Sequence, residues 1–236
     1  MTIHNAGLIH RNFHSGNILR CFNGSQHKTL ISDLGQYKPP DKPILYDNVN
    51  INVYGVLPYV APEVLYGGEY SEASDVYSFG MVMWEITTGL HPFYDRAHDE
   101  KLAWDICNGL RPALILETPR CFAELMELCW DANPKRRPDI RELEKIFMSW
   151  GWHMGISQKH DVFDQFISAE NERQRLLKSD ELESLKKPHP EAIYKSRLLN
   201  FQNLPKPVNR LSYLRVSAER SSFSFISGDD GKFNLK

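Results

Sequence analysis

The stretch Gly7-Leu-Ile-His-Arg-Asn-Phe-His-Ser-Gly-Asn-Ile-Leu19 decides how the rest of the chain is interpreted. It runs from the apolar pair Leu8-Ile9 through polar and small residues to the apolar pair Ile18-Leu19. A polar segment that is fixed at both ends by apolar residues is typical of an active-site loop on a rigid scaffold. We therefore expect residues 10–17 to form a functional loop.

A second stretch, Ile31-Ser-Asp-Leu-Gly35, repeats this design with an apolar lead, one acid and a glycine. Asn17 of the first stretch and Asp33 of the second both carry side-chain oxygens, which are the ligands that Mg²⁺ takes in proteins. The pattern favours a site at which Asn17 and Asp33 converge on one hard cation.

Three motifs carry a family resemblance. His10-Arg-Asn12, followed after four residues by Asn17, resembles the protein-kinase catalytic loop His-Arg-Asp-(four residues)-Asn. Asp33-Leu-Gly35 resembles the Asp-Phe-Gly metal motif, and Ala61-Pro-Glu63 matches Ala-Pro-Glu. The order and spacing of the three motifs make this resemblance specific. Phe13-His-Ser-Gly16 is similar to the tyrosine-kinase-like branch of the family.

The resemblance implies a mainly α-helical fold, the protein-kinase lower lobe (C-lobe), with small β-hairpins. It assigns residues 1–152 to a protein-kinase-like domain that starts in mid-domain. No Gly-x-Gly-x-x-Gly and no Val-Ala-x-Lys occurs in the 236 residues, so the upper-lobe (N-lobe) elements that hold the ATP phosphates are expected to be absent. Either the chain is a truncated gene product, or it is a lower lobe that serves as a binding module.

Local signals predict the main elements. Asn23-Gly24 between two apolar runs predicts a hairpin of residues 18–22 with residues 30–32. Residues 73–89 are apolar on nearly every side and should form a buried helix that ends at Gly89. Shorter helical segments are expected at 1–7, 101–109, 121–130 and 140–150.

The composition changes after Trp152. Residues 153–187 are expected to contain a charged helix, which Lys187-Pro-His-Pro190 breaks. Residues 188–236 carry serine clusters, prolines and scattered aromatic residues, and they are interpreted as a mostly disordered tail.

The resemblance also assigns catalytic-loop positions. His10 and Arg11 match the family, but Asn12 stands at the position of the catalytic aspartate. An amide cannot accept the proton of a substrate hydroxyl, and a positioned general base contributes about 10²–10⁴-fold to the rate. His14 replaces a phosphate-facing lysine of serine/threonine kinases, and Val56 replaces a hydroxyl residue that contacts the same group. Three positions that touch one another in the family have thus changed together.

The cofactors implied are ATP and Mg²⁺. Asn17 and Asp33 would bind the metal, and Leu19 would lie under the adenine ring. Packing in the strand core explains Leu19 equally well. Because half of the nucleotide cleft is missing from the sequence, we expect this chain alone to bind nucleotide poorly.

Three further residues are assigned structural roles. In the family, the first-turn acid of the central helix, here Asp75, accepts hydrogen bonds from the catalytic-loop backbone. The glutamate of Ala-Pro-Glu pairs with an arginine, so Glu63 is expected to meet Arg137 in a two-pronged ion pair. Arg136 is interpreted as a solvated surface residue.

The segment between Asp33 and Glu63 corresponds to the activation segment and contains no serine or threonine. Tyr46 and Tyr54 are therefore the candidate phosphorylation sites. Simple packing of these tyrosines is the alternative that we favour.

Net charge, apolar runs and cysteine spacing limit the kinds of partner that this chain is expected to have. The formal net charge is −2, which gives no reason to expect nucleic acid or an anionic membrane as a partner. No apolar run approaches the roughly 20 residues that a membrane-spanning helix needs. The four cysteines show no C-x-x-C spacing and are typical of a reduced, cytoplasmic protein. A protein substrate or protein partner is expected, and the oligomeric state stays open.

Two functions follow from these observations. The family function is ATP-dependent phosphorylation of protein hydroxyl groups in signalling, and the changes around Asn12 predict that this chain is inactive alone. The alternative is a pseudokinase-like module that binds another protein.

Overall fold

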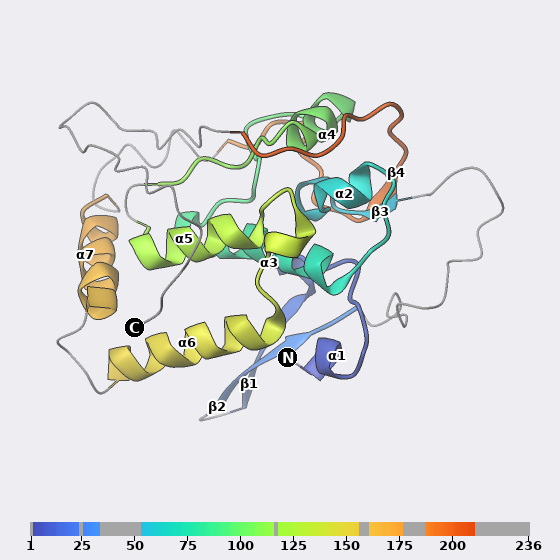
Figure 1. The fold of residues 1–236 in the computed structure, drawn as a ribbon. Coiled ribbons are helices and arrows are strands. Elements are labelled where there is room, and N and C mark those ends of the chain that lie inside the picture. Colours follow the sequence, from blue (N-terminus) through green and yellow to red (C-terminus); the bar gives the residue numbers. More distant parts are fainter. Residues whose placement is uncertain are drawn as a thin grey trace.

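A computed structural model describes residues 2–23, 26–33, 53–115, 118–155, 161–176 and 187–210. This part of the chain is mainly helical, with two small antiparallel sheets, β1–β2 below the helices and β3–β4 beside α2 in Figure 1. The predicted fold class, mainly α-helical with small β-sheets, is confirmed.

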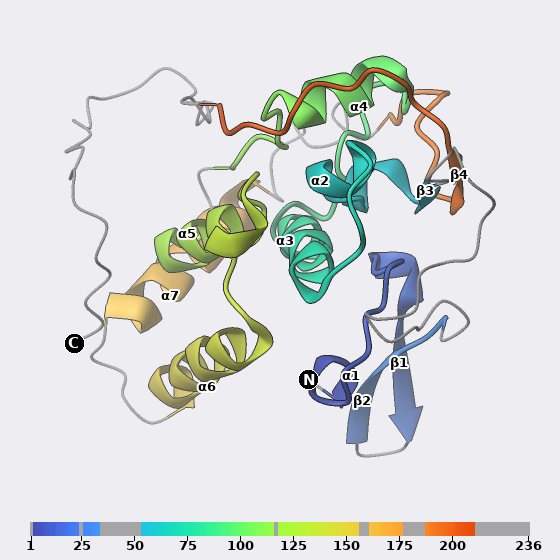
Figure 2. The same cartoon turned by 45° about the vertical axis from the view of Figure 1, so that its right-hand side comes forward.

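Helix α3 (Glu72–Thr88) is the buried centre, and Figure 2 shows it with α2 and α5 beside it. Its first turn is closed by a capping box, in which Ser71 and Ser74 each accept a hydrogen bond from the other's backbone N–H. Gly89 ends it in the left-handed conformation, with φ of 69°. Gly80 lets α5 approach closely, since a Cβ there would lie 3.0 Å from the Cβ of Cys129. The predicted helix over 73–89 is therefore confirmed almost to the residue.

The remaining helices surround α3. One of them, α6, is longer than the sequence predicts. The sequence predicts an end at Trp150, but α6 continues to Gly155 and crosses the expected domain boundary at residue 152. The rings of Phe122, Trp150 and Phe166 pack together where α5, α6 and α7 meet. The bounds of these helices are Thr2–Asn5 (α1), Pro62–Leu65 (α2), Glu100–Cys107 (α4), Arg120–Cys129 (α5), Ile140–Gly155 (α6) and Asp161–Leu176 (α7).

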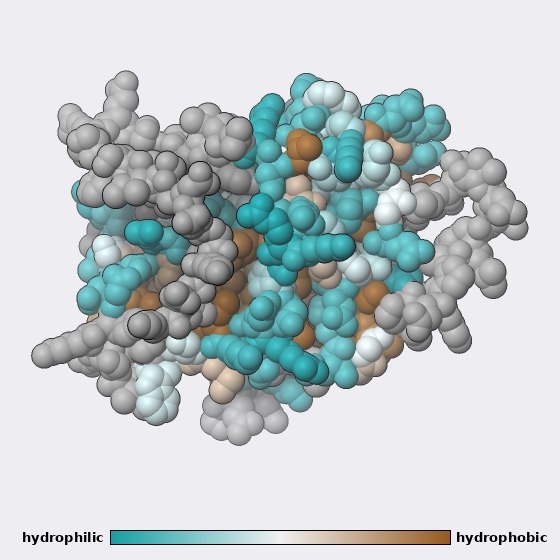
Figure 3. All heavy atoms as spheres, in the orientation of Figure 1, coloured by the Kyte–Doolittle hydropathy of each residue, from teal (hydrophilic) through white to brown (hydrophobic). Residues whose placement is uncertain are grey.

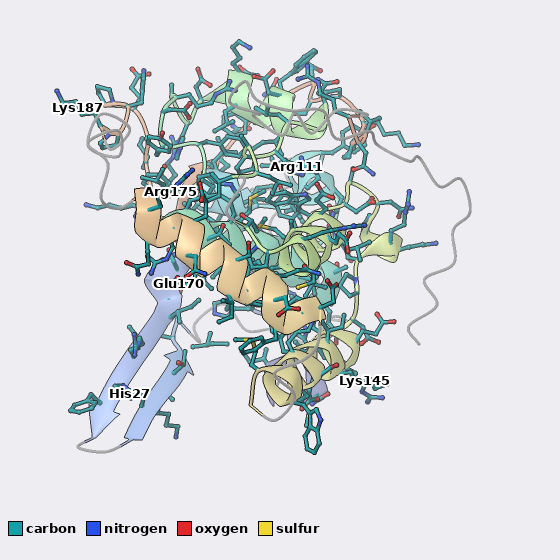
Figure 4. The ribbon with its side chains drawn as sticks, turned by 90° about the vertical axis from the view of Figure 1, so that its left-hand side faces the viewer. His27, Arg111, Lys145, Glu170, Arg175 and Lys187 are labelled. Carbon is teal, nitrogen blue, oxygen red and sulfur yellow. The ribbon has the colours of Figure 1, made fainter. Side chains whose placement is uncertain are left out.

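The first sheet is the expected hairpin. Strand β1 (Ile18–Asn23) pairs antiparallel with β2 (Gln26–Ile31), in a register that sets Ile18 opposite Ile31. The hairpin projects from the helices, and His27 lies on its outer part in Figure 4. Helix α7 lies on the near face of the same view, with Glu170 and Arg175 on its surface.

The second sheet corrects the prediction for the tail. Strand β3 (Val53–Gly55) pairs with β4 (Arg197–Leu199), which lies inside the segment interpreted as mostly disordered. Residues 187–210 instead pack along α4 and the loop before it. The N–H of His189 donates to the carbonyl of Tyr94 at 2.7 Å, and the N–H of Val208 donates to the carbonyl of Cys107 at 2.9 Å.

The physical reason for this order is that the segment carries its own core residues. Leu199 and Leu204 are both buried, and the leucines are supported by main-chain hydrogen bonds along the segment. This burial outweighs the polar composition that suggested disorder. Residues 211–236 of the predicted tail lie outside the described residues.

Hydrophilic residues make up most of the coloured surface in Figure 3, with small groups of hydrophobic atoms showing between them. Among the described residues, no helix is both long enough and apolar enough to span a membrane.

Candidate functional site

The loop of residues 10–17 is held at its start by Asp75 of α3. The N–H of His10 donates to Asp75 Oδ2 at 2.7 Å, and the N–H of Arg11 donates to Oδ1 at 2.9 Å. His4 Nε2 lies 2.8 Å from the same carboxylate. Arg11 adopts a positive φ of 68°, which a residue with a side chain rarely takes. The buried Asp75 carboxylate thus fixes an unfavourable backbone turn, as expected for the residue that shapes this loop.

Asn12, Asn17 and Asp33 meet beside the base of the hairpin. Asn12 is buried, and its Nδ2 donates to Asp33 Oδ2 at 2.8 Å. Asn17 Nδ2 lies 3.3 Å from the same oxygen and donates to the carbonyl of Asn12 at 2.9 Å. Two stretches that are 16 residues apart are therefore brought to one point, since the N–H of Ser32 donates to the carbonyl of Asn17 at 2.8 Å.

Ser196 also reaches this site, although sequence reasoning missed it. Asn12 Nδ2 donates to Ser196 Oγ at 2.9 Å, and Ser196 Oγ donates to Asn12 Oδ1 at 3.1 Å. The contact joins residues 184 positions apart in the chain. The only signal in the sequence was the run Ala192-Ile-Tyr-Lys-Ser-Arg-Leu-Leu199, whose β-branched, aromatic and leucine residues favour a strand.

His14 and Val56 complete the surroundings of Asn12. His14 Nδ1 accepts from the N–H of Gly16 at 3.1 Å, and its Nε2 lies 3.1 Å from Asn17 Nδ2. Burial lowers the pKa of His14, and the nearby His10 lowers that pKa further. Val56 is buried and lines the same small cavity as Asn12. His14 thus places a neutral imidazole where serine/threonine kinases have a lysine. Val56 places an apolar side chain where many kinases have a hydroxyl residue.

Glu63 and Arg137 form the two-pronged pair. Arg137 Nη1 donates to Glu63 Oε1 at 2.6 Å, and Nη2 donates to Oε2 at 2.7 Å. The Arg137 side chain is fully buried, and its remaining donors reach the carbonyls of Ala73 and Asp131. Arg136 is exposed, as expected. This pair ties α2 to the start of α3 and to the loop before α6.

The remaining predicted residues lie apart from this cluster or outside the described residues. Leu19 is on the hairpin and 48% exposed, which excludes the interpretation as strand core. Tyr54 is exposed in β3, and its carbonyl accepts from the hydroxyl of Tyr70 at 2.9 Å. Leu34 and Tyr46 fall outside the described residues.

The donor set beside the hairpin fits one hard cation. Asp33 offers a carboxylate, and Asn17 offers a carbonyl oxygen once its amide is turned over, which exchanges the two ends of the side chain. Among the described residues, no group of three or more His, Cys, Asp or Glu side chains gathers to hold a metal by itself. A cation at this point would therefore need further oxygens from a bound molecule or water.

Comparison with known proteins settles the family. Residues 2–147, more than half of the chain, match the family described as protein tyrosine and serine/threonine kinase. The chain belongs to the protein kinase family. The described part of the chain is mainly helical, and the motif at the catalytic-loop position reads His-Arg-Asn where the family pattern has His-Arg-Asp.

Several proteins are similar to this chain over part of their length. A protein of Acanthamoeba polyphaga mimivirus named as a serine/threonine-protein kinase/receptor is 35% identical over 144 residues, which is 61% of this chain and 8% of that protein. Mitogen-activated protein kinase kinase kinase 7 of Homo sapiens is 38% identical over 96 residues, or 40% of this chain and 16% of that protein. Cyclic GMP-binding protein C of Dictyostelium discoideum is 36% identical over 149 residues, or 61% of this chain and 6% of that protein. The chain thus spans less than a fifth of the length of these relatives.

Proposed function

We propose that this chain is a kinase lower lobe that binds a protein segment at its substrate site and does not transfer phosphoryl groups by itself. The observation that carries the proposal is the side chain of Asn12. Its Nδ2 donates to Asp33 Oδ2 at 2.8 Å and its Oδ1 accepts from Ser196, so a neutral amide stands at the position where catalysis needs a proton acceptor, and an amide cannot take up a proton as a carboxylate does.

The neighbours of Asn12 support the same proposal. Transfer of a phosphoryl group depends on positioning and on neutralising negative charge. The neutral His14 and the apolar Val56 supply no positive charge and no hydroxyl group beside Asn12.

Kinases in general use ATP and Mg²⁺, and we propose which residues would hold them here. Asn17 and Asp33 would bind Mg²⁺, and the exposed Leu19 would face the adenine ring. When bound, the cofactor supplies the phosphoryl group and the cation shields its charge. Because a ligand pocket usually buries most of its ligand, these three side chains alone would give weak nucleotide binding.

The proposed partner is a protein, and the proposed compartment is the cytoplasm. All four cysteines are free thiols, which is typical of a reducing compartment. The net charge of −2 offers no attraction for nucleic acid or an anionic membrane.

The test compares the chain with Asn12→Asp. Phosphoryl transfer from Mg²⁺-ATP to a protein mixture is measured for both, alone and with the upper lobe of a related kinase placed in front. We expect no transfer by the chain alone. With an upper lobe, Asn12→Asp should exceed the parent by about 10²-fold or more. Equal rates for parent and variant in that setting would show that Asn12 supports catalysis and would overturn the proposal.

A further inference from the structure

The segment around β4 lies on the candidate site and presents a hydroxyl group to it. Ser196 Oγ exchanges hydrogen bonds with the amide of Asn12 at 2.9 and 3.1 Å. In kinases the residue at this position of the catalytic loop receives the hydroxyl group of the protein substrate. A serine of the same chain therefore stands in the place of the acceptor residue.

We propose that residues 191–199 are a built-in pseudosubstrate, which fills the peptide-binding surface of the lobe until it is displaced. The inference rests on the proposed function, because it takes this surface to be the substrate site of a kinase lobe. Beyond the proposed function, the pseudosubstrate proposal names the segment that is bound and the residue that controls its release.

The backbone of the segment binds as a peptide would. β4 adds to β3 in antiparallel register, with Leu199 opposite Val53 and Arg197 opposite Gly55. Addition of an extended segment to a free strand edge is a common mode of peptide recognition, because the main-chain bonds suit any sequence and the side chains give specificity. The two strands lie side by side in both ribbon views (Figures 1 and 2).

Main-chain and side-chain contacts before and after Ser196 hold the segment in this register. Before it, the N–H of His98 donates to the carbonyl of Glu191 at 3.0 Å, and the hydroxyl of Tyr194 donates to the carbonyl of Pro92 at 3.1 Å. After it, Arg197 donates to the carbonyl of His98, and the side chain of Leu199 is buried. The serine is thus fixed from both sides and does not reach Asn12 by chance orientation of a free end.

The same geometry indicates that modification of Ser196 would release the segment from the surface, and we call Ser196 the release position. Ser196 Oγ and Asp33 Oδ2 both accept from Nδ2 of Asn12, so a negative group at position 196 would come close to the Asp33 carboxylate. Like charges that share a site repel, and a phosphate at this serine would add about two negative charges. Phosphorylation of Ser196 by another kinase would therefore expel the segment and open the surface.

The experiment asks whether the surface accepts the same segment from outside once the tethered copy is weakened. The probe is a fluorescent peptide of residues 189–204, and its binding is measured by anisotropy. Leu199→Asp should displace β4, because it puts a charge on a buried position, whereas Leu198→Asp is the matched control, because Leu198 is 53% exposed on the same strand.

A tethered segment competes at an effective concentration of about millimolar, so peptide at about micromolar concentration should bind Leu199→Asp at least about tenfold tighter than the parent chain. Leu198→Asp should behave like the parent. Equal binding to Leu199→Asp and the parent, with the circular dichroism of both unchanged, would overturn the proposal.

Ser196→Asp keeps the test decisive if Leu199→Asp does not fold. It is compared with Ser196→Ala, which removes the hydroxyl group without adding charge. We expect faster amide hydrogen exchange over residues 53–55 and tighter peptide binding in Ser196→Asp, with a smaller change in Ser196→Ala. Unchanged exchange and binding in Ser196→Asp would refute the release position and the pseudosubstrate together.

The two proposals fail in different assays. Phosphoryl transfer by the parent chain would refute the proposed lack of activity while leaving the peptide result intact. Failure of the peptide to bind an opened and folded variant would refute the pseudosubstrate while leaving the transfer assay unaffected.

Discussion

The two small sheets of this chain are both two-stranded and antiparallel, but one projects from the helices and the other packs against them. β1–β2 is a local hairpin that projects from the helices, and its Phe22 is 69% exposed. β3–β4 joins residues 53–55 to residues 197–199, and its Leu199 is only 3% exposed. The first sheet carries Asn17 and Asp33 at its base, and the second brings Ser196 to the same point.

This difference in burial and in sequence separation indicates which part of the candidate site each sheet positions. The strands of the hairpin follow each other in the chain, so their pairing is local. The β3–β4 pair closes a long loop and is held by burial and by main-chain bonds from α4 to the tail. We infer that the hairpin positions Asn17 and Asp33, the residues proposed to bind Mg²⁺, and that the β3–β4 pair decides whether this site is accessible to another protein.

The largest expected loss of stability comes from a residue outside both sheets, Arg137, and the losses expected for the sheet residues are compared with it. Arg137→Ala leaves the Glu63 carboxylate without its partner, and breaking a buried pair costs about 3–5 kcal/mol. Because Glu63 is 18% exposed, we expect the lower end of that range. Arg136→Ala is the control, since the side chain is 67% exposed, and it should change the free energy of unfolding by less than about 0.5 kcal/mol. Urea melts measure both, and a loss below about 1 kcal/mol for Arg137→Ala would mean that the pair does not stabilise the lobe.

The next effect contrasts the sheets directly. Leu199→Ala should cost about 2–3 kcal/mol, because it removes a buried side chain from the core. Leu198→Ala and Phe22→Ala replace exposed residues on β4 and on the hairpin, and each should cost less than about 0.5 kcal/mol. Equal losses for Leu199→Ala and Phe22→Ala would remove the distinction between a docked sheet and a projecting one.

The sequence predicts the hairpin and α3 well, because their signals are local. Asn23-Gly24 indicates the turn, and Gly89 indicates the end of the helix. The pair of Glu63 with Arg137 came from the family resemblance, since residues 74 positions apart leave no local signal. β4 was missed because three residues in a proline-containing segment are too few to show a period, and its partner strand lies far away in the sequence.

A smaller expected effect is a pH dependence of stability that arises from His98, a residue beside the β3–β4 sheet. Burial lowers the pKa of His98, which contacts the segment before β4, and the nearby charges of Arg197 and Arg96 lower it further. The unfolded state then binds a proton near the ordinary value of 6.5 while folded His98 stays neutral, so stability is full above that value and falls as the pH drops below it.

Urea melts between about pH 7.5 and about pH 5.5 should show this loss, at most about 1.4 kcal/mol per pH unit for each histidine. The pKa of His14, at the base of the hairpin, is lowered as well, so His14→Gln is the matched comparison for His98→Gln. Each variant should flatten part of the pH dependence. Only His98→Gln should also flatten the pH dependence of hydrogen exchange over residues 53–55, and a matching change in His14→Gln would argue against a separate role for His98.

The most direct test of the account is the energetic coupling between Asn12 and Ser196, the contact through which the distant tail reaches the catalytic loop. Asn12→Ala, Ser196→Ala and the double variant are compared with the parent by urea melts. We predict a coupling free energy of about 0.5–1.5 kcal/mol, as for a partly buried side-chain hydrogen bond. Additive losses, within about 0.3 kcal/mol, would show that Ser196 and Asn12 do not interact and would contradict the account.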